Sequence, residues 1–107
     1  ASIFKLTERY SANVLLKGRY SLIHNSINEH PFMITTGNPG MATAGMGDLL
    51  TGVTCSLLGQ FGTEYAAKIT SIAAHLHSKS GDLASHRGER GMIASDLLPY
   101  IRKLVNP

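Results

Sequence analysis

Asp48 is the only charged side chain between Pro31 and Thr63, and it stands where a glycine-rich loop runs into an apolar helix. An ionised carboxylate in such surroundings is costly unless another group uses or pairs it. The dipole and the free N–H groups of a first helical turn favour that ionised form. Just before it, Gly45-Met46-Gly47 can bring bare backbone N–H groups close to an anion, as helix N-termini do for phosphates. The segment therefore predicts an anion-binding cradle of backbone N–H groups beside an ionised, functional carboxylate.

A cradle and a carboxylate together suit phosphoryl transfer to a hydroxyl group. The N–H groups would neutralise charge on the moving phosphate while Asp48 takes the hydroxyl proton. Residues 45–48 alone also fit a simpler interpretation, in which an aspartate caps a helix after a glycine turn. The string Gly-x-x-x-x-Gly-Lys-Ser/Thr is absent from the sequence, which excludes a P-loop protein.

The histidines do not have the spacing of a metal site. His75 and His77 are two residues apart, so on a helix they point to different faces. The other three have no cysteine or carboxylate at ligand spacing; they are His24, His30 and His86. We therefore expect surface histidines or hydrogen-bonded core histidines, and no metal ion held by histidine.

Two further aspartates and the single cysteine are expected to be structural. Asp82 could touch a nucleotide or a metal ion, but a position on a helix surface is favoured. Asp96, after Ser95, is expected as a first-turn helix charge. Cys55 cannot build a disulfide framework and is expected to be a small buried apolar side chain.

Hydrophobic periodicity and turn residues predict the first half of the chain to hold one helix and three short strands. The helix, at 1–10, has Ile3, Leu6 and Tyr10 at helical spacing and no convincing N-terminal cap. The first strand, at 13–17, is of the type found in buried parallel sheets. The next two strands, at 21–24 and 32–35, look like a hairpin around a polar turn at 25–28.

Three helices are predicted after the glycine-rich loop. The helix at 49–58 is apolar on almost every side, which predicts burial among neighbours. Gly52 inside it costs about 1 kcal/mol against alanine, which predicts a close contact there. A longer helix follows with Thr63 as N-cap, and Gly81 is expected to end or bend it. The last helix begins near Ser95 and tolerates Pro99 in its first turn.

This order of elements predicts the α/β class, with residues 1–107 forming a single, partial domain at the C-terminal end of a larger layered domain. A helix that is apolar all round needs cover on several sides, and the strands need sheet partners. We therefore expect the chain to act as a homo-oligomer or together with a missing N-terminal portion of the same domain.

Composition and charge exclude several classes of protein. With 43% hydrophobic and 16% charged residues, the chain is too apolar to be disordered. Ten Lys and Arg residues against seven Asp and Glu residues give a net charge of +3, but the basic residues are spread along the chain, so we expect no nucleic-acid partner. No apolar run approaches the ~18 to 20 residues that cross a bilayer, so we expect no membrane partner. One cysteine and no signal peptide predict a cytoplasmic location.

Longer strings of residues resemble one known family. The string TGNPGMATAGMGDLLTG at 36–52 closely resembles the signature loop of the NAD(P)H-hydrate dehydratases, of the ribokinase-like superfamily. The string LKGRYS at 16–21 resembles the Lys-Gly-x-x-Thr nucleotide segment of that family, with Ser21 in place of the usual threonine. Leu76-His77, Gly81-Asp82 and GERGMIASDLL at 88–98 also look like it. The resemblance covers essentially the whole chain, and only the C-terminal part of the family's domain.

The resemblance implies a ribokinase-like three-layer α/β/α fold and a repair reaction. Members of the family dehydrate the hydrated form of NADH or NADPH, and use ADP or ATP to phosphorylate its hydroxyl group before it leaves as phosphate. By position, Asp48 would be the base and would contact the hydrate together with Asn38. Gly45, Met46 and Gly47 would be the phosphate cradle. The nucleotide would bind at Gly47 and at Lys17, Gly18, Arg19, Tyr20 and Ser21. Mg²⁺ would screen the phosphate charge.

Two other functions remain open on the sequence. A small-molecule kinase of the same superfamily, for a sugar or a vitamin, would share Asp48 and its cradle but transfer the phosphate permanently. The stretch at 38–43 favours the dehydratase, because such kinases resemble it only at Gly-x-Gly-Asp. An inactive nucleotide-binding or assembly module is the third possibility.

Overall fold

A three-stranded antiparallel sheet forms the centre of the chain, whose computed structural model describes residues 2–18, 20–25 and 30–107. The strand order is β1 (Val14–Leu16), β2 (Ser21–His24), β3 (Phe32–Ile34). All three strands were predicted, and the β2–β3 hairpin is confirmed by the pairing of Ser21 with Ile34. Most of its predicted turn, at 26–28, lies outside the described residues.

The predicted parallel character of the first strand is wrong. In the sheet, β1 runs antiparallel to β2, with Val14 opposite His24. Only four residues separate the two strands, and a parallel pair needs a crossover connection of about a dozen residues or more. The apolar run that suggested a buried parallel strand is only partly buried at all three residues of β1.

Helix α1 (Ile3–Tyr10) has a cap that the sequence analysis missed. The Ser2 hydroxyl accepts a hydrogen bond from the N–H of Phe4 at 3.2 Å, which satisfies one free donor of the first turn. The buried face also differs from the predicted one, because it consists of Ile3 and Thr7 while Tyr10 is exposed. Thr7 tolerates burial because its hydroxyl donates to the Ile3 carbonyl and contacts His24 Nδ1 at 3.0 Å.

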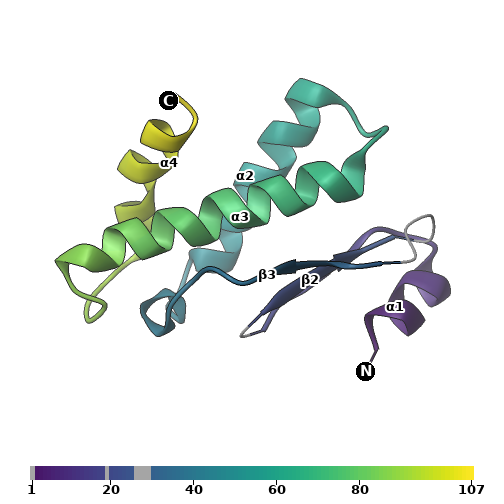
Figure 1. Ribbon diagram of the computed structural model, residues 1–107, viewed down its shortest axis with the longest axis horizontal. Coiled ribbons are helices and arrows are strands. Elements are labelled where there is room, and N and C mark those ends of the chain that lie inside the picture. The colour runs from purple at the N-terminus through teal and green to yellow at the C-terminus, as the bar shows by residue number, and fades with distance from the viewer. Residues whose placement is uncertain (1, 19, 26–29) are drawn as a thin grey trace.

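Helices α2 (Met46–Phe61) and α3 (Ala66–Ala84) pack side by side, and α3 lies over the sheet. The predicted N-cap of the longer helix is wrong, because α3 begins at Ala66 and Thr63 lies in the turn before it. Gly81 does not end α3, which continues for three more residues. Figure 1 shows the sheet between α3 on one side and α1 on the other, which is a helix, sheet and helix layering.

Helix α2 is less buried than predicted. Only Met46 and Leu50 are buried in it, and Cys55, expected to be buried, is exposed. Gly52 has no atom within 4 Å of the place where a β-carbon would stand, so the expected close contact is absent. The reason is that α2 packs mainly against α3, along one side, and the rest of its apolar surface stays open in the described part of the chain.

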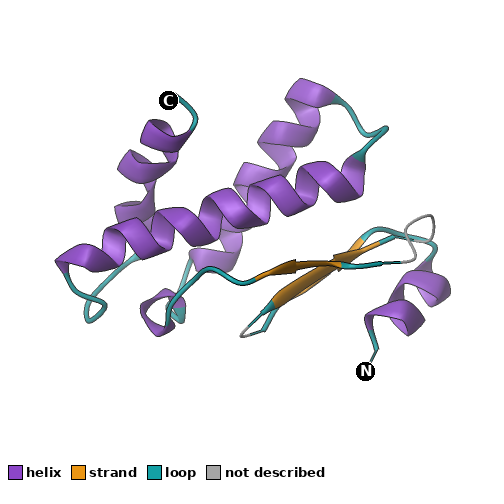
Figure 2. Ribbon diagram, viewed as in Figure 1, coloured by secondary structure: helices purple, strands orange, loops and turns teal. Residues whose placement is uncertain are grey.

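A short helix, η1 (Pro39–Met41), lies in the loop between β3 and α2. The C-terminal region consists of three short helices that close the second part of the core, namely η2 (Ser85–Arg87), η3 (Ala94–Leu97) and α4 (Leu98–Leu104), drawn with the other helices in Figure 2. The predictions for Pro99 and Asp96 are confirmed. Pro99 lies in the first turn of α4, and Asp96 accepts the Ile93 N–H at 2.8 Å.

Two groups of buried side chains hold these elements together. One joins the sheet to α2 and α3 through Ile23, Ile34, Leu50, Ala67 and Ala74. The other joins the start of α2 to the end of α3 and to η3, through Met46, Ala84, Met92 and Leu97. The start of α2 is therefore anchored in the core. Among the described residues, no helix combines the length and the hydropathy that a membrane crossing requires.

Candidate active site

A cavity of about 660 Å³ lies between the segment after β1, the loop after β3 and the middle of α3. Six of the residues predicted from the sequence line it: Lys17, Gly18, Tyr20, Ser21, Asn38 and Met46. Gly45, Gly47 and Asp48 are not among its lining residues. Arg19 lies outside the described residues. The fold thus brings the predicted nucleotide segment, the Asn38 loop and the first residue of α2 to one cavity.

The Lys17 side chain connects that cavity to the glycine cradle. A β-carbon placed on Gly47 would stand 2.7 Å from Lys17 Nζ, so the ammonium group lies directly against the first turn of α2. Thirty residues of sequence separate the two, and the β1–β2–β3 meander returns the chain to make the contact. The predicted cradle therefore has a positive charge beside it.

The cradle itself is formed by the way α2 begins. Gly45 takes the N-cap position with φ at 87°, a left-handed conformation that favours glycine. The N–H of Leu49 bonds to the Gly45 carbonyl at 2.9 Å, so the N–H groups of Gly47 and Asp48 precede that helical bond. Asp48 lies in the first turn, as predicted, and its side chain is exposed. The carboxylate is thus solvated, and it stands beside N–H groups that can bind an anion.

The loop after β3 is shaped by Asn38 and anchored by Asp82. The Asn38 side chain accepts the N–H of Gly40 at 3.0 Å and donates to Asp82 Oδ1 at 3.0 Å. The other oxygen of Asp82 accepts the N–H of Gly37, also at 3.0 Å. Asp82 lies on α3 and is partly exposed, as expected for a helix-surface residue, but its carboxylate also has a role that the sequence analysis did not identify. It holds a loop that lies 44 residues away in the sequence.

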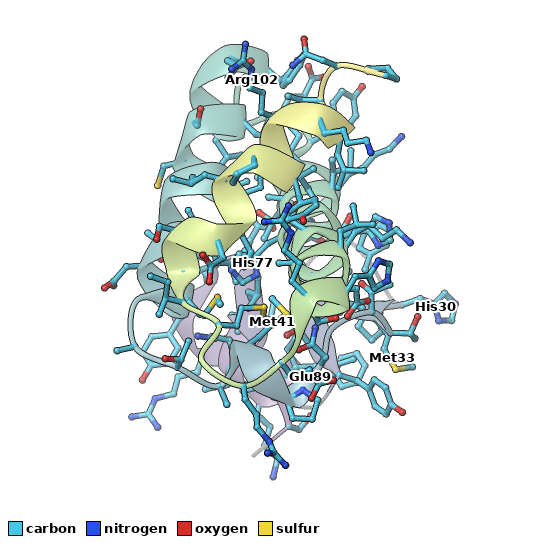
Figure 3. The ribbon with its side chains drawn as sticks, turned by 90° about the vertical axis from the view of Figure 1, so that its left-hand side faces the viewer. His30, Met33, Met41, His77, Glu89 and Arg102 are labelled. Atoms are coloured by element: carbon cyan, nitrogen blue, oxygen red, sulfur yellow. The ribbon has the colours of Figure 1, made fainter. Side chains whose placement is uncertain are left out.

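Two glycines let the same loop approach its neighbours closely, one in α3 and one in the loop itself. A β-carbon on Gly81 would overlap the thioether of Met41, so the loop rests directly on the α3 backbone. A β-carbon on Gly40 would stand 2.8 Å from the carbonyl oxygen of Glu89. Figure 3 shows Met41 in the interior with Glu89 near it in that view. The Asn38 loop is therefore held on both sides.

His77 is a site residue that the sequence analysis did not identify. It lines the cavity, is 7% exposed, and places Nε2 3.0 Å from the carbonyl oxygen of Met46. Burial lowers the pKa of His77 below its usual 6.5, the hydrogen bond to Met46 opposes this shift, and the Lys17 charge adds to it. His75, as predicted, points to another face and is exposed. Among the described residues, no three His, Cys, Asp or Glu side chains gather as metal ligands would.

Comparison with known proteins identifies what this chain is similar to. The family model described as NAD(P)H-hydrate dehydratase matches residues 3–103. The bifunctional NAD(P)H-hydrate repair enzyme Nnr of Vibrio cholerae serotype O1 is 41% identical over 107 residues, 99% of this chain. The enzyme of the same name from Escherichia coli K12 is 38% identical over 106 residues, 96% of this chain.

A solved structure agrees with these matches at the level of the fold. The ADP/ATP-dependent NAD(P)H-hydrate dehydratase from Bacillus subtilis, co-crystallised with ATP and Mg²⁺, superposes with a TM-score of 0.78 at 21% identity. The match covers 95% of this chain and 38% of that one. The chain spans about a fifth of the length of the two curated relatives. The predicted α/β class and family are confirmed by these matches.

Proposed function

The chain belongs to the NAD(P)H-hydrate dehydratase family, and on that premise we propose that it carries the phosphate-handling site of an enzyme that dehydrates hydrated NADH or NADPH with ADP or ATP. The observation that carries the proposal is the contact of the Lys17 ammonium with Gly47. It supplies positive charge next to backbone N–H donors, at the edge of a cavity large enough for a small-molecule ligand.

In the proposed reaction, Asp48 removes the proton from the hydroxyl group of the hydrate. The hydroxyl oxygen then forms a bond to the terminal phosphorus of the nucleotide, and the phosphoanhydride bond to that phosphorus breaks. The carbon–oxygen bond of the phosphorylated hydrate breaks next, inorganic phosphate leaves, and loss of a proton from the neighbouring carbon restores the double bond. The exposed Asp48 carboxylate in the first turn of α2 suits the first step, because a base must be ionised and within reach of its substrate.

The nucleotide is proposed to lie along Lys17, Gly18, Arg19, Tyr20 and Ser21, with its phosphates on the Gly45-Met46-Gly47 cradle. The donor set suits an anion, since it combines one ammonium group with first-turn N–H groups. Mg²⁺ usually binds through one or two carboxylates and the phosphates of its nucleotide rather than in an all-protein cage. Such an ion would be held mainly by the phosphates of the nucleotide, and its charge would neutralise them.

Asn38 is proposed to contact the hydrate through the loop that it shapes. Its side chain is engaged with Gly40 and Asp82, so the loop is already ordered before a ligand binds. An ordered loop costs less entropy on binding than one that must fold around its ligand. A cytoplasmic location is proposed with the same reaction, because a chain with a single cysteine suits a reducing compartment.

The test is the recovery of NADH from its hydrate with ADP or ATP and Mg²⁺, in the parent protein and in Asp48→Asn. Removal of the base should lower turnover by at least ~10²-fold and leave nucleotide affinity nearly unchanged. Asp96→Asn is the matched control, because Asp96 also lies in a first helical turn but serves the Ile93 N–H. Equal loss of affinity and turnover in Asp48→Asn would show that Asp48 is a structural cap. Accumulation of a phosphorylated product without release of phosphate would show a kinase.

Two exposed aromatic side chains between α2 and α3 are proposed to be covered in the active assembly. Phe61, the last residue of α2, is 70% exposed, and Tyr65, just before α3, is 65% exposed. We propose a second copy of the chain or a further part of the same domain as the cover. Sedimentation of the 107-residue chain checks this, because a monodisperse 11.5 kDa monomer with sharp cooperative unfolding would show that no cover is needed.

A further inference from the structure

We propose that His77 is a positioning residue of the phosphate site, which fixes the direction of the Gly47 N–H through its hydrogen bond to the Met46 carbonyl. The inference deepens the proposed function and rests on it. His77 touches neither the phosphate nor the reacting atoms in this account. It acts through the backbone of α2.

The first step is the contact itself. Met46 is the first residue of α2, and His77 lies in the middle of α3, 31 residues later. The His77 ring is buried among the helices (Figure 3), and its Nε2 lies 3.0 Å from the Met46 carbonyl oxygen. That oxygen can accept a second bond within α2, because a carbonyl has two lone pairs. The ring therefore braces the opening turn of α2 from the side of α3.

The second step is the identity of the peptide group that His77 holds. The carbonyl of Met46 and the N–H of Gly47 belong to one peptide bond, which is planar and trans. Holding the oxygen therefore fixes the direction of the N–H on the opposite side of the same plane. Gly47 has no side chain to restrict that plane, and the Lys17 ammonium lies 2.7 Å from the place where its β-carbon would stand. A hydrogen bond to the carbonyl also polarises the peptide group, which makes its N–H a better donor.

The third step is the protonation of the ring. A carbonyl oxygen only accepts hydrogen bonds, so Nε2 of His77 must carry a proton. Burial and the charge of Lys17 oppose a second proton, which keeps the ring neutral and leaves Nδ1 as an acceptor. A neutral ring with one defined tautomer gives one defined orientation of the Gly47 peptide plane.

His24 provides a matched control for simple loss of a buried histidine. It is 6% exposed, close to the 7% of His77, and its ring also makes one hydrogen bond at 3.0 Å, to Thr7 Oγ1. Its neighbours are α1 and the Phe4 ring, and it does not line the cavity. Removal of His24 should therefore cost stability without changing the Gly47 peptide group.

The experiment compares His77→Ala, His77→Gln and His24→Ala by calorimetric titration with ATP and Mg²⁺, together with kcat and KM for the hydrate. His77→Ala should weaken nucleotide affinity by about five- to tenfold, the fold-change that corresponds to one hydrogen bond. His77→Gln should restore most of it, because the glutamine amide can donate at nearly the same place as Nε2. His24→Ala should lower Tm and leave the affinity at the parent value. Parent affinity in a folded His77→Ala, or the same loss in His24→Ala, would overturn the inference.

Nuclear magnetic resonance of the parent protein tests the same inference without any turnover. The ¹⁵N shifts of His77 should show a proton on Nε2 and none on Nδ1, and the Gly47 amide resonance should move in His77→Phe, which cannot donate a hydrogen bond, but not in His24→Phe. A proton on Nδ1 with a bare Nε2, or an unmoved Gly47 resonance, would refute the inference even if His77→Ala does not fold. A parent protein that shows these shifts but binds neither ADP nor ATP would instead refute the proposed function.

Discussion

Lys17 Nζ lies 2.7 Å from the point where a β-carbon on Gly47 would stand, so the ammonium group occupies the space of the missing side chain. The contact explains why glycine suits this position, although glycine in a helix costs about 1 kcal/mol relative to alanine. An alanine at position 47 would displace only the end of the flexible Lys17 side chain. Such a substitution can therefore change ligand affinity while the free energy of unfolding stays nearly the same.

Gly47→Ala should therefore fold normally but bind ADP and ATP more weakly. The added methyl group displaces the Lys17 ammonium from the cradle, and loss of one charge-assisted contact should weaken affinity by about tenfold or more. Calorimetric titration and thermal unfolding measure the two effects. Gly52→Ala is the control in the same helix, with no atom within 4 Å, and should keep the affinity while stability rises by up to about 1 kcal/mol. Unchanged affinity in Gly47→Ala would contradict the proposed phosphate site.

Gly81→Ala should destabilise the protein by about 1 to 3 kcal/mol, because the new methyl group overlaps the Met41 side chain in a buried position. Denaturant unfolding gives the free energy. Combination with Met41→Ala should recover part of the loss, since the shorter side chain makes room. Gly59→Ala serves as the helical control with open space around it. Additive losses in the double variant would show that Met41 does not lie on Gly81.

Asp82→Ala should raise KM for the hydrate more than it lowers kcat. The carboxylate anchors the Asn38 loop through the Gly37 N–H and the Asn38 amide, so its loss frees a loop that the ligand must then order. Asn38→Ala breaks the same bond from the other side. A double-mutant cycle should therefore give a coupling energy of about 1 kcal/mol between the two residues. A coupling near zero would mean that Asp82 and Asn38 act independently.

The pH dependence of stability should contain a component from His77. Its pKa is lowered in the folded protein, chiefly by burial, so below pH 6.5 the unfolded chain binds a proton that the folded chain resists. The contribution of the neutral ring is fully present above pH 6.5 and is lost as the pH falls towards the lowered value, with a slope of at most about 1.4 kcal/mol per pH unit. Unfolding of the parent and of His77→Gln between pH about 7.5 and about 5 measures it. Parallel curves for the two proteins would contradict it.

The sequence by itself determined the family of this protein and the position of its candidate site. Asp48 stands alone among uncharged residues, and the glycines before it mark the start of a helix, because the opening of a helix depends on a few consecutive residues. Three strands and the helices after the loop followed from hydrophobic periodicity, and the string at 36–52 carried the family resemblance. Helix boundaries were less accurate, as the start of α3 at Ala66 shows.

Only the tertiary structure decided which distant residues meet at the candidate site. Lys17 meets Gly47, Asp82 holds Asn38, and His77 braces Met46, and these pairs are 30, 44 and 31 residues apart in the sequence. Such contacts depend on how the sheet and α3 pack against each other. The spacing of apolar residues along one helix predicts which face is buried, but not which element packs against that face. The same reason explains the exposed Cys55 on α2. Apolar residues around a helix show that it can be buried, but the packing of α3 decides which of its sides is covered.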